Sequence, residues 1–228
     1  MSFYGSLAAL VMGMVIILFT DIFFFIVLLL FLLFTHRVTI WKYDLKKERG
    51  LAEGKSGERG VKNVLSNGIV AIIVALLYVP LNKVCPGLPN FLFLLSVASA
   101  AADSFASEIG VLSDNVYLIT RPRERVMPGT DGGVSTLGHI SAFMGSVLVV
   151  LPGFFLLTDY LDIEKHGLPF SYVYLITLVV LAWVNSQIDS LLGATLQRNG
   201  IIGNNGVNVL SISLTTFLGA IIYCTIHI

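Results

Sequence analysis

Residues 96–138 read SVASAAADSFASEIGVLSDNVYLITRPRERVMPGTDGGVSTLG, an apolar segment that runs into a loop of arginines and glycines. The apolar part carries Asp103 and Glu108. A carboxylate is costly inside a membrane span, and where one occurs it generally serves a function. We therefore expect these two acids to mark a functional site, with the rest of the chain arranged around them.

The loop that follows the acids combines cations with glycine-flanked backbone N–H groups. Its candidates are Arg121, Arg123, Arg125, Gly129, Thr130, Gly132 and Gly133. Guanidinium groups and closely approaching backbone N–H groups are the donors that bind phosphates and other anions in proteins. The stretch therefore predicts an anion-binding loop directly after a carboxylate-bearing span.

The composition places this site in a membrane protein. Hydrophobic residues make up 56% of the 228 residues, charged residues only 12%, and the mean hydropathy is +0.87. These values exclude an ordinary soluble domain. Cys85 and Cys224 are far apart and belong to no CxxC pattern, so the sequence supports neither a metal cluster nor a redox motif. We predict an all-α, polytopic bundle of about six to seven transmembrane helices.

The N-terminal residues 1–34 are expected to form a retained membrane anchor. Leu7 to Phe34 is apolar except for Thr20 and Asp21. As a single helix its 28 residues would measure about 42 Å, more than one span but less than two spans and a turn. One tilted helix and a short hairpin hinged at Asp21 are both consistent with this length. We interpret Asp21 as a helix break.

Residues 35–67 are expected to form a basic cytoplasmic loop. The segment holds eight of the fourteen Lys and Arg residues, and positive residues favour the cytoplasmic side. It contains no Walker A pattern. Arg59 and Asn67 lie where the chain re-enters the membrane, which sets them apart from a freely solvated loop.

The remaining residues, 68–228, are predicted to form the helical core of one membrane domain covering residues 1–228. Cytoplasmic loops are expected at 113–135 and 198–208, and an acidic external loop at 158–169. Asn185, Asp189, Gly193 and Gln197 recur every four residues, which gives a polar stripe that cannot comfortably face lipid.

Asp103 and Asp189 are predicted to lie at similar depths. Counting along ideal helices, Asp103 lies about 14 Å below Leu112 and Asp189 about 12 Å below Gln197. Two carboxylates that meet below a basic surface suit a divalent cation, and Mg²⁺ is commonly bound by one or two carboxylates together with substrate phosphates. From the residues alone, the chain is a membrane enzyme or carrier for an anionic, phosphorylated ligand. His139, next to the glycine loop, is interpreted as a structural residue of the interface.

Four separated motifs carry a resemblance to a known family. They are ERGVKNVLSNG (58–68), AAADSFASEIGVLS (100–113), LITRPRERVMPGTDGGVSTLG (118–138) and DSLLGATLQ (189–197). In this order they resemble the integral membrane family that contains phytyl-phosphate kinase and the transmembrane protein 19 group. The resemblance implies a kinase that uses CTP, or another nucleoside triphosphate, to convert an isoprenyl monophosphate such as phytyl or geranylgeranyl phosphate into its diphosphate.

The resemblance also implies roles for individual residues. As metal ligands it gives Asp103, Glu108 and Asp189, and as further catalytic residues Arg121 and Arg125. Its nucleotide- and phosphate-binding candidates are Arg59, Asn67, Gly129, Thr130, Gly132, Gly133, Ser135, Ser190, Gln197 and Asn208. The expected cofactors are Mg²⁺ and CTP, and the expected partners are the isoprenyl phosphate and membrane lipids, with no nucleic acid. A nucleotidyltransferase that forms a CDP-lipid and a transporter of an anionic lipid are the alternatives.

Overall fold

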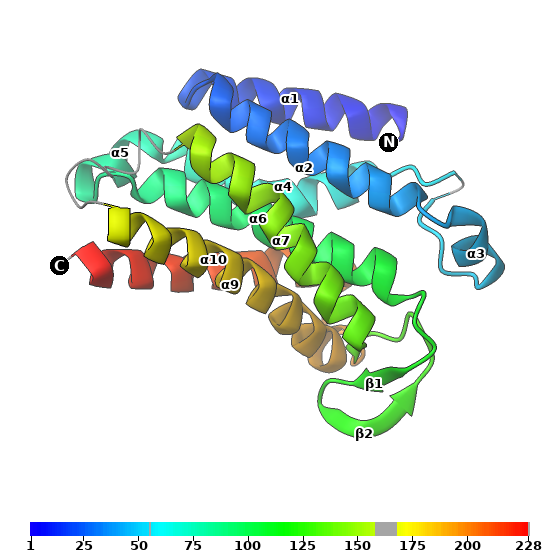
Figure 1. Ribbon diagram of the computed structural model, residues 1–228. Coiled ribbons are helices and arrows are strands. Elements are labelled where there is room, and N and C mark those ends of the chain that lie inside the picture. Colours follow the sequence, from blue (N-terminus) through cyan, green and yellow to red (C-terminus); the bar gives the residue numbers. More distant parts are fainter. Residues whose placement is uncertain (55, 158–167, 228) are drawn as a thin grey trace.

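The computed structural model describes residues 1–54, 56–157 and 168–227, and these form a mostly helical bundle (Figure 1). The helices are α1 (Phe3–Phe19), α2 (Ile22–Ile40), α3 (Tyr43–Glu48), α4 (Val61–Leu76), α5 (Tyr78–Val84), α6 (Leu88–Gly110), α7 (Thr136–Leu157), α9 (Leu168–Leu192) and α10 (Asn204–His227). A one-turn π-helix, η2 (Gly193–Gln197), continues α9. The predicted acidic loop at 158–169 lies largely outside the described residues.

Within the described part of the chain, five helices are long and apolar enough to cross a membrane. They are Ile22–Ile40, Leu88–Gly110, Thr136–Leu157, Tyr172–Gln197 and Asn204–Ile226. The pair α4 and α5, bent by 62° at their junction, makes a sixth if it forms one broken span. This gives five to six spans where the sequence suggested six to seven, and the apolar helix α1, with 17 residues, is shorter than any of the five.

Asp21 separates the two N-terminal helices. Its carboxylate accepts a hydrogen bond from the backbone N–H of Phe23 at 2.7 Å and so caps the start of α2. The N-terminal apolar stretch is thus two helices joined at Asp21, and the interpretation of this residue as a helix break is confirmed.

Helix α6 is the centre of the bundle and packs against α2, α4, α7, α9 and α10. Its residues from Leu88 to Ala102 are all buried. Large side chains such as Phe91 and Phe93 fill the core at its first half, and small residues in the second half let the neighbouring helices approach closely. The buried Asn185 of α9 donates to the Ser99 carbonyl and accepts from Thr215, so part of the predicted polar stripe ties α9 to α6 and α10.

The predicted loops are shorter and more ordered than the sequence suggested. Of residues 35–67, the first six continue α2 and the last seven begin α4, with α3 between them. Thr35 and Thr39 support this extension because their hydroxyls donate to carbonyls one turn earlier. Similarly, α10 already begins at Asn204, inside the predicted loop 198–208.

Residues 113–135 contain a small antiparallel sheet of β1 (Val116–Leu118), β2 (Arg121–Val126) and β3 (Gly133–Val134), in the order β2-β1-β3. Val116 and Leu118 are buried, whereas Tyr117 between them is exposed. Strands this short leave too little alternation to be recognised in the sequence. In Figure 1 the sheet and α3 lie at the same end of the bundle as the last turn of α6 and the first turn of α7, with α5 at the other end.

Candidate functional site

A cavity of about 320 Å³ opens at the end of the bundle that carries the sheet. Its walls come from the last turns of α6, the first turn of α7, the end of α9 with η2, and the loop from Gly129 to Ser135. Leu51 and Glu53 close one side, and Asn204 at the start of α10 contributes to another. Three of the four resembling motifs therefore meet around one space.

Asp103 of α6 and Asp189 of α9 line this cavity together. Their carboxyl groups are close enough to share a hydrogen bond, and the Ser211 hydroxyl donates to Asp189 at 3.0 Å. The prediction that the two acids face each other at one depth is confirmed. Two carboxyl groups in contact require a proton or a cation between them, because two adjacent charges of the same sign repel each other.

The cavity is strongly acidic. Its lining contains five carboxylates, Glu53, Asp103, Glu108, Asp131 and Asp189, and no Lys or Arg among the residues that the structure describes. No group of three His, Cys, Asp or Glu residues in this part of the chain is arranged to hold a metal ion. The geometry therefore offers a pair of carboxylates, not the triad of Asp103, Glu108 and Asp189.

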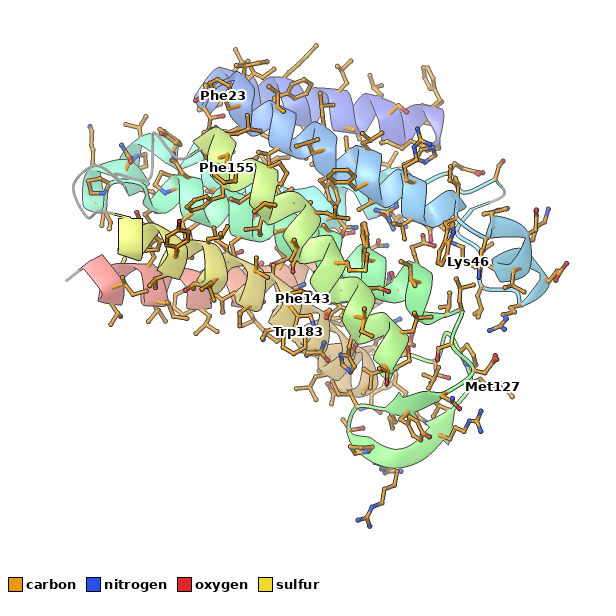
Figure 2. All side chains as sticks on the ribbon, viewed as in Figure 1. Phe23, Lys46, Met127, Phe143, Phe155 and Trp183 are labelled. Carbon is orange, nitrogen blue, oxygen red and sulfur yellow. The ribbon has the colours of Figure 1, made fainter. Side chains whose placement is uncertain are left out.

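Glu108 has a different partner, the buried Lys46 of α3. The Lys46 ammonium lies 2.6 Å from the Glu108 carboxylate and also donates to the carbonyls of Thr39 at 2.6 Å and Val38 at 3.2 Å. All three of its protons are thus used, and its side chain has no exposed surface. Lys46 lies where α3 meets the bundle (Figure 2) and joins the end of α2 to α6.

Arg59 lies close behind the acidic wall. It is 8% exposed, and its guanidinium donates to the Ser104 hydroxyl and the Thr39 hydroxyl, each at 3.3 Å. Burial lowers the pKa of Arg59, and the nearby Glu108, Glu53 and Asp103 oppose this shift. The guanidinium remains charged in any case. Among the described residues, Lys46 and Arg59 from the segment before α4 are thus cations that interact with acids of the cavity wall.

Burial also acts on Glu53, which the sequence did not single out. It raises the pKa of this carboxyl, with nearby Glu108 and Glu58 adding to the shift and Arg59 and Lys46 opposing it. A raised pKa means that the folded protein disfavours the charged form of this acid more than water does. Glu53 thus belongs to the same charge network as Arg59 and Glu108.

The glycine loop docks on the π-helix η2. Gly132 has a φ of +75°, and a Cβ placed there would overlap Ala194 of η2. Only glycine permits this conformation at this close approach. The Gln197 amide donates to the Asp131 carboxylate at 2.8 Å, which fastens the same two segments. Gln197 therefore holds the loop in place.

Several loop groups that were predicted to bind phosphate are engaged within the loop. The N–H groups of Thr130 and Gly133 donate to the carbonyls of Met127 and Thr130, and the Thr130 hydroxyl also donates to Met127. The Ser135 hydroxyl accepts from the N–H of Gly138 at 3.0 Å and so caps α7. The predicted loop residues nonetheless all line the cavity; they are Gly129, Thr130, Gly132, Gly133 and Ser135.

The arginines of the sheet lie outside the cavity lining. Arg121 pairs with Glu124 at 3.1 Å, and Arg125 donates to the Asp114 carbonyl at 2.8 Å. Both side chains are exposed, because β2 is an edge strand on the outside of the sheet, near the exposed Met127 (Figure 2). Arg121 and Arg125, which were expected to belong to the anion-binding site, therefore do not line the cavity that holds the carboxylates.

The other predicted residues divide between two places. Ser190 lines the acidic cavity. Asn67 lies in a second, apolar cavity together with Arg59, and Asn208 is buried in α10 outside both linings. His139, interpreted as structural, lines the acidic cavity, and its carbonyl accepts from the Trp183 indole at 3.2 Å.

Sequence reasoning missed Glu53, Asp131 and Lys46. Asp131 stands within the quoted glycine loop, so its place between Thr130 and Gly132 was an available signal. No sequence signal distinguished Glu53 or Lys46, since each is one charge among many in a hydrophilic segment. Their burial depends on how that segment folds back against α6.

Comparison with known proteins identifies the family. Residues 1–216 match the family model described as integral membrane protein DUF92. The chain is 29% identical to an uncharacterized membrane protein of Methanocaldococcus jannaschii over 223 residues, which covers 97% of this chain and 85% of the relative. It is 28% identical to an uncharacterized membrane protein of Synechocystis, covering 78% of this chain and 63% of the relative.

The protein named PGR of Arabidopsis thaliana is also 28% identical, over 85% of this chain and 79% of the relative. No solved structure matches the chain. The match to the family model extends over nearly the whole sequence and includes every residue of the acidic cavity. The chain therefore belongs to the DUF92 family of integral membrane proteins.

Proposed function

We propose that the chain is a Mg²⁺-dependent kinase that transfers the γ-phosphoryl group of a nucleoside triphosphate, with CTP the expected donor, to an isoprenyl monophosphate such as phytyl or geranylgeranyl phosphate. The observation that carries this proposal is the contact between Asp103 and Asp189 in a polar cavity at the end of a membrane bundle. The motif resemblance to phytyl-phosphate kinase supports the choice of reaction.

The carboxylate pair fits a Mg²⁺ site. Mg²⁺ is typically held by one or two carboxylates, with water and substrate phosphates completing its shell. Asp103 and Asp189 are the residues that would hold it, and the ion would neutralise charge on the donor triphosphate. An anionic substrate needs such a counter-charge here, since no Lys or Arg belongs to the described lining of the cavity.

The cavity suits the polar donor. Its volume of about 320 Å³ lies at the lower end of the range for small-molecule sites, which is about 300–1,000 Å³. The first turn of α7 borders it at Ser135, Gly138 and His139, and the positive end of a helix dipole attracts phosphate.

The reaction needs little help from a base. An oxygen of the acceptor phosphate attacks the γ-phosphorus, and the bond from that phosphorus to the β–γ bridging oxygen breaks. The electron pair leaves with the nucleoside diphosphate, and the acceptor becomes a diphosphate. A phosphate monoester is already anionic near neutral pH, so catalysis consists mainly of positioning and charge stabilisation.

The cavity is proposed to face the cytoplasm. Twelve of the fourteen Lys and Arg residues belong to residues 37–62, 121–125 and 198. These segments adjoin the end of the bundle that holds the cavity, as the positive-inside rule requires of a cytoplasmic face.

Labelled CTP tests the proposal. Purified protein is incubated with geranylgeranyl monophosphate, Mg²⁺ and CTP labelled at either the α- or the γ-phosphate. Transfer of γ-label to the lipid supports the kinase. Transfer of α-label would establish a CDP-lipid-forming nucleotidyltransferase instead, and no transfer of either label from any nucleoside triphosphate would refute both. The variant Asp103→Asn serves as the inactive control.

A further inference from the structure

A second cavity lies between α1, α2 and α4, and its two parts differ in character. The apolar part is lined by Ala9, Met12, Leu28, Phe31, Leu32 and Val64. The polar lining residues are Thr35, His36, Arg59, Asn63 and Asn67. The cavity is therefore amphipathic, with a hydrocarbon lining that leads to a buried guanidinium.

Arg59 is incompletely satisfied at this place. Its two contacts, to Ser104 and Thr39, are both 3.3 Å long, and its Nε has no hydrogen-bond partner among the described residues. The Oδ1 atom of Asn67, which is 4% exposed, is also buried there without a described partner. Glu108, Glu53 and Asp103 offset part of the cost of burying this cation, but its Nε keeps a donor that no described group accepts.

Arg59 also connects the two cavities. Its partner Ser104 is adjacent in sequence to Asp103, which lines the acidic cavity on the other side. Arg59 also interacts electrostatically with Asp103, so an anion that bound to Arg59 would lie within electrostatic range of that acid. This is where the phosphate of an acceptor must be if its chain occupies the apolar part.

The apolar part can widen through methionine. The whole cavity is narrow as it stands, with a volume of about 20 Å³, so a hydrocarbon chain could enter only if side chains moved. A Cβ at Gly68 of α4 would overlap the terminal methyl of Met12 from α1. Methionine side chains are flexible and adapt to irregular partners, and the outer face of α1, with Leu7, Leu10 and Val11, is exposed where lipid surrounds it. A hydrocarbon chain can therefore replace Met12 from the bilayer side.

We propose that this cavity binds the acceptor, a single-chain lipid monophosphate. Its phosphate accepts hydrogen bonds from Arg59, and its hydrocarbon chain follows the seam between α1, α2 and α4 in the place of Met12. The narrowness of the seam selects one chain over the two chains of an ordinary phospholipid. The role as acceptor rests on the proposed kinase function, whereas the binding itself does not.

Photo-crosslinking locates the lipid without requiring turnover. Full-length protein in lipid nanodiscs is labelled with geranylgeranyl monophosphate that carries a diazirine on its chain, and the modified peptides are identified by mass spectrometry. We expect modification in residues 1–12, 28–32 and 61–68, which line the seam. It should be abolished by unlabelled geranylgeranyl monophosphate and unaffected by equimolar inorganic phosphate. Modification confined to other helices, or equal competition by inorganic phosphate, would overturn the proposal.

Variants then test the phosphate contact and the hydrocarbon contact separately. Arg59→Gln should weaken binding of geranylgeranyl monophosphate by about 10- to 100-fold, because a charged hydrogen bond is lost, while the exposed Arg123→Gln should leave it unchanged. Gly68→Leu should weaken binding by pushing Met12 into the seam, and adding Met12→Ala should restore it. Wild-type affinity in Arg59→Gln, or no recovery in the double variant, contradicts the proposal.

The results also distinguish the two proposals. Crosslinking along the seam without any phosphoryl transfer would leave the binding site standing and refute the kinase. Transfer of γ-label together with crosslinks confined to other helices would leave the kinase standing and refute the binding site. If Arg59→Gln does not fold, the crosslinking map and the Gly68 pair still decide the question.

Discussion

Replacing Lys46 by Met tests whether Glu108 is a structural residue or a metal ligand. Met has a similar length but no charge, so Lys46→Met leaves the Glu108 carboxylate, whose side chain is 10% exposed, without its cation. It also removes the donor to the carbonyls of Thr39 and Val38. Breaking a buried ion pair from one side costs about 3–5 kcal/mol of folding free energy.

That loss should be visible as a lower melting temperature. For a protein of this size 1 kcal/mol corresponds to about 2–4 °C, so we expect Lys46→Met to melt about 6–20 °C below the wild type in detergent. The neighbouring Lys47 is exposed, so Lys47→Met is the matched control, with an expected change within about 0.5 kcal/mol.

The double variant completes the test. Lys46→Met with Glu108→Leu removes both charges and should be more stable than Lys46→Met alone by about 2 kcal/mol, since the uncompensated carboxylate is gone. If Glu108 is structural and the chain binds Mg²⁺, Mg²⁺ should raise the melting temperatures of the double variant and of the wild type by the same amount. The structural assignment would be refuted if the stability changes of the two single variants simply added up in the double variant, or if the double variant no longer responded to Mg²⁺.

Three further predictions concern the acidic cavity. Asp103→Asn and Asp189→Asn should each relieve the contact between two carboxyl groups, so the stability of each variant should equal or exceed that of the wild type. Both variants should lose turnover and any Mg²⁺-induced rise in melting temperature. Normal turnover in either variant would exclude the carboxylate pair as the metal site. Gly132→Ala should destabilise the protein by about 1–3 kcal/mol more than Gly200→Ala. Both glycines have a positive φ, but of the two only Gly132 lies against another backbone segment. Equal melting temperatures of the two variants would contradict the docking of the loop on η2. Glu53→Gln should be more stable than the wild type at pH 7, because burial raises the pKa of Glu53 and the folded state disfavours its charge. This difference should disappear as the pH falls below the ordinary pKa of 4.5, and denaturation curves that show no such convergence would count against the burial of Glu53.

The membrane spans followed from the sequence because hydropathy and length are local properties. The apolar runs around Asp103 and Asp189 were long enough to be recognised as helices, and a fixed rise per residue placed both acids at a similar depth. Their similar depth could therefore be predicted without knowing how the helices pack, whereas their meeting in one cavity depends on packing. Helix α1 was harder to interpret, since its length falls between a span and a half-span.

The charges of the site could not be assigned in the same way. Asp103 and Glu108 are five residues apart, so on a helix their side chains point about 140° apart. One meets Asp189 of α9 and the other meets Lys46 of α3. Helical spacing shows that the directions differ, but only packing decides which direction faces a carboxylate and which a lysine.

By itself the sequence determined a helical membrane protein with two acids at one depth and a loop of glycines beside them. The tertiary structure decided which cations serve the site, bringing Lys46 and Arg59 inward and leaving Arg121 and Arg125 on an exposed strand. The physical reason is that burial of a charge depends on partners that are remote in sequence. Lys46 and Glu108, which are 62 residues apart, make that contact only once α3 has folded against α6.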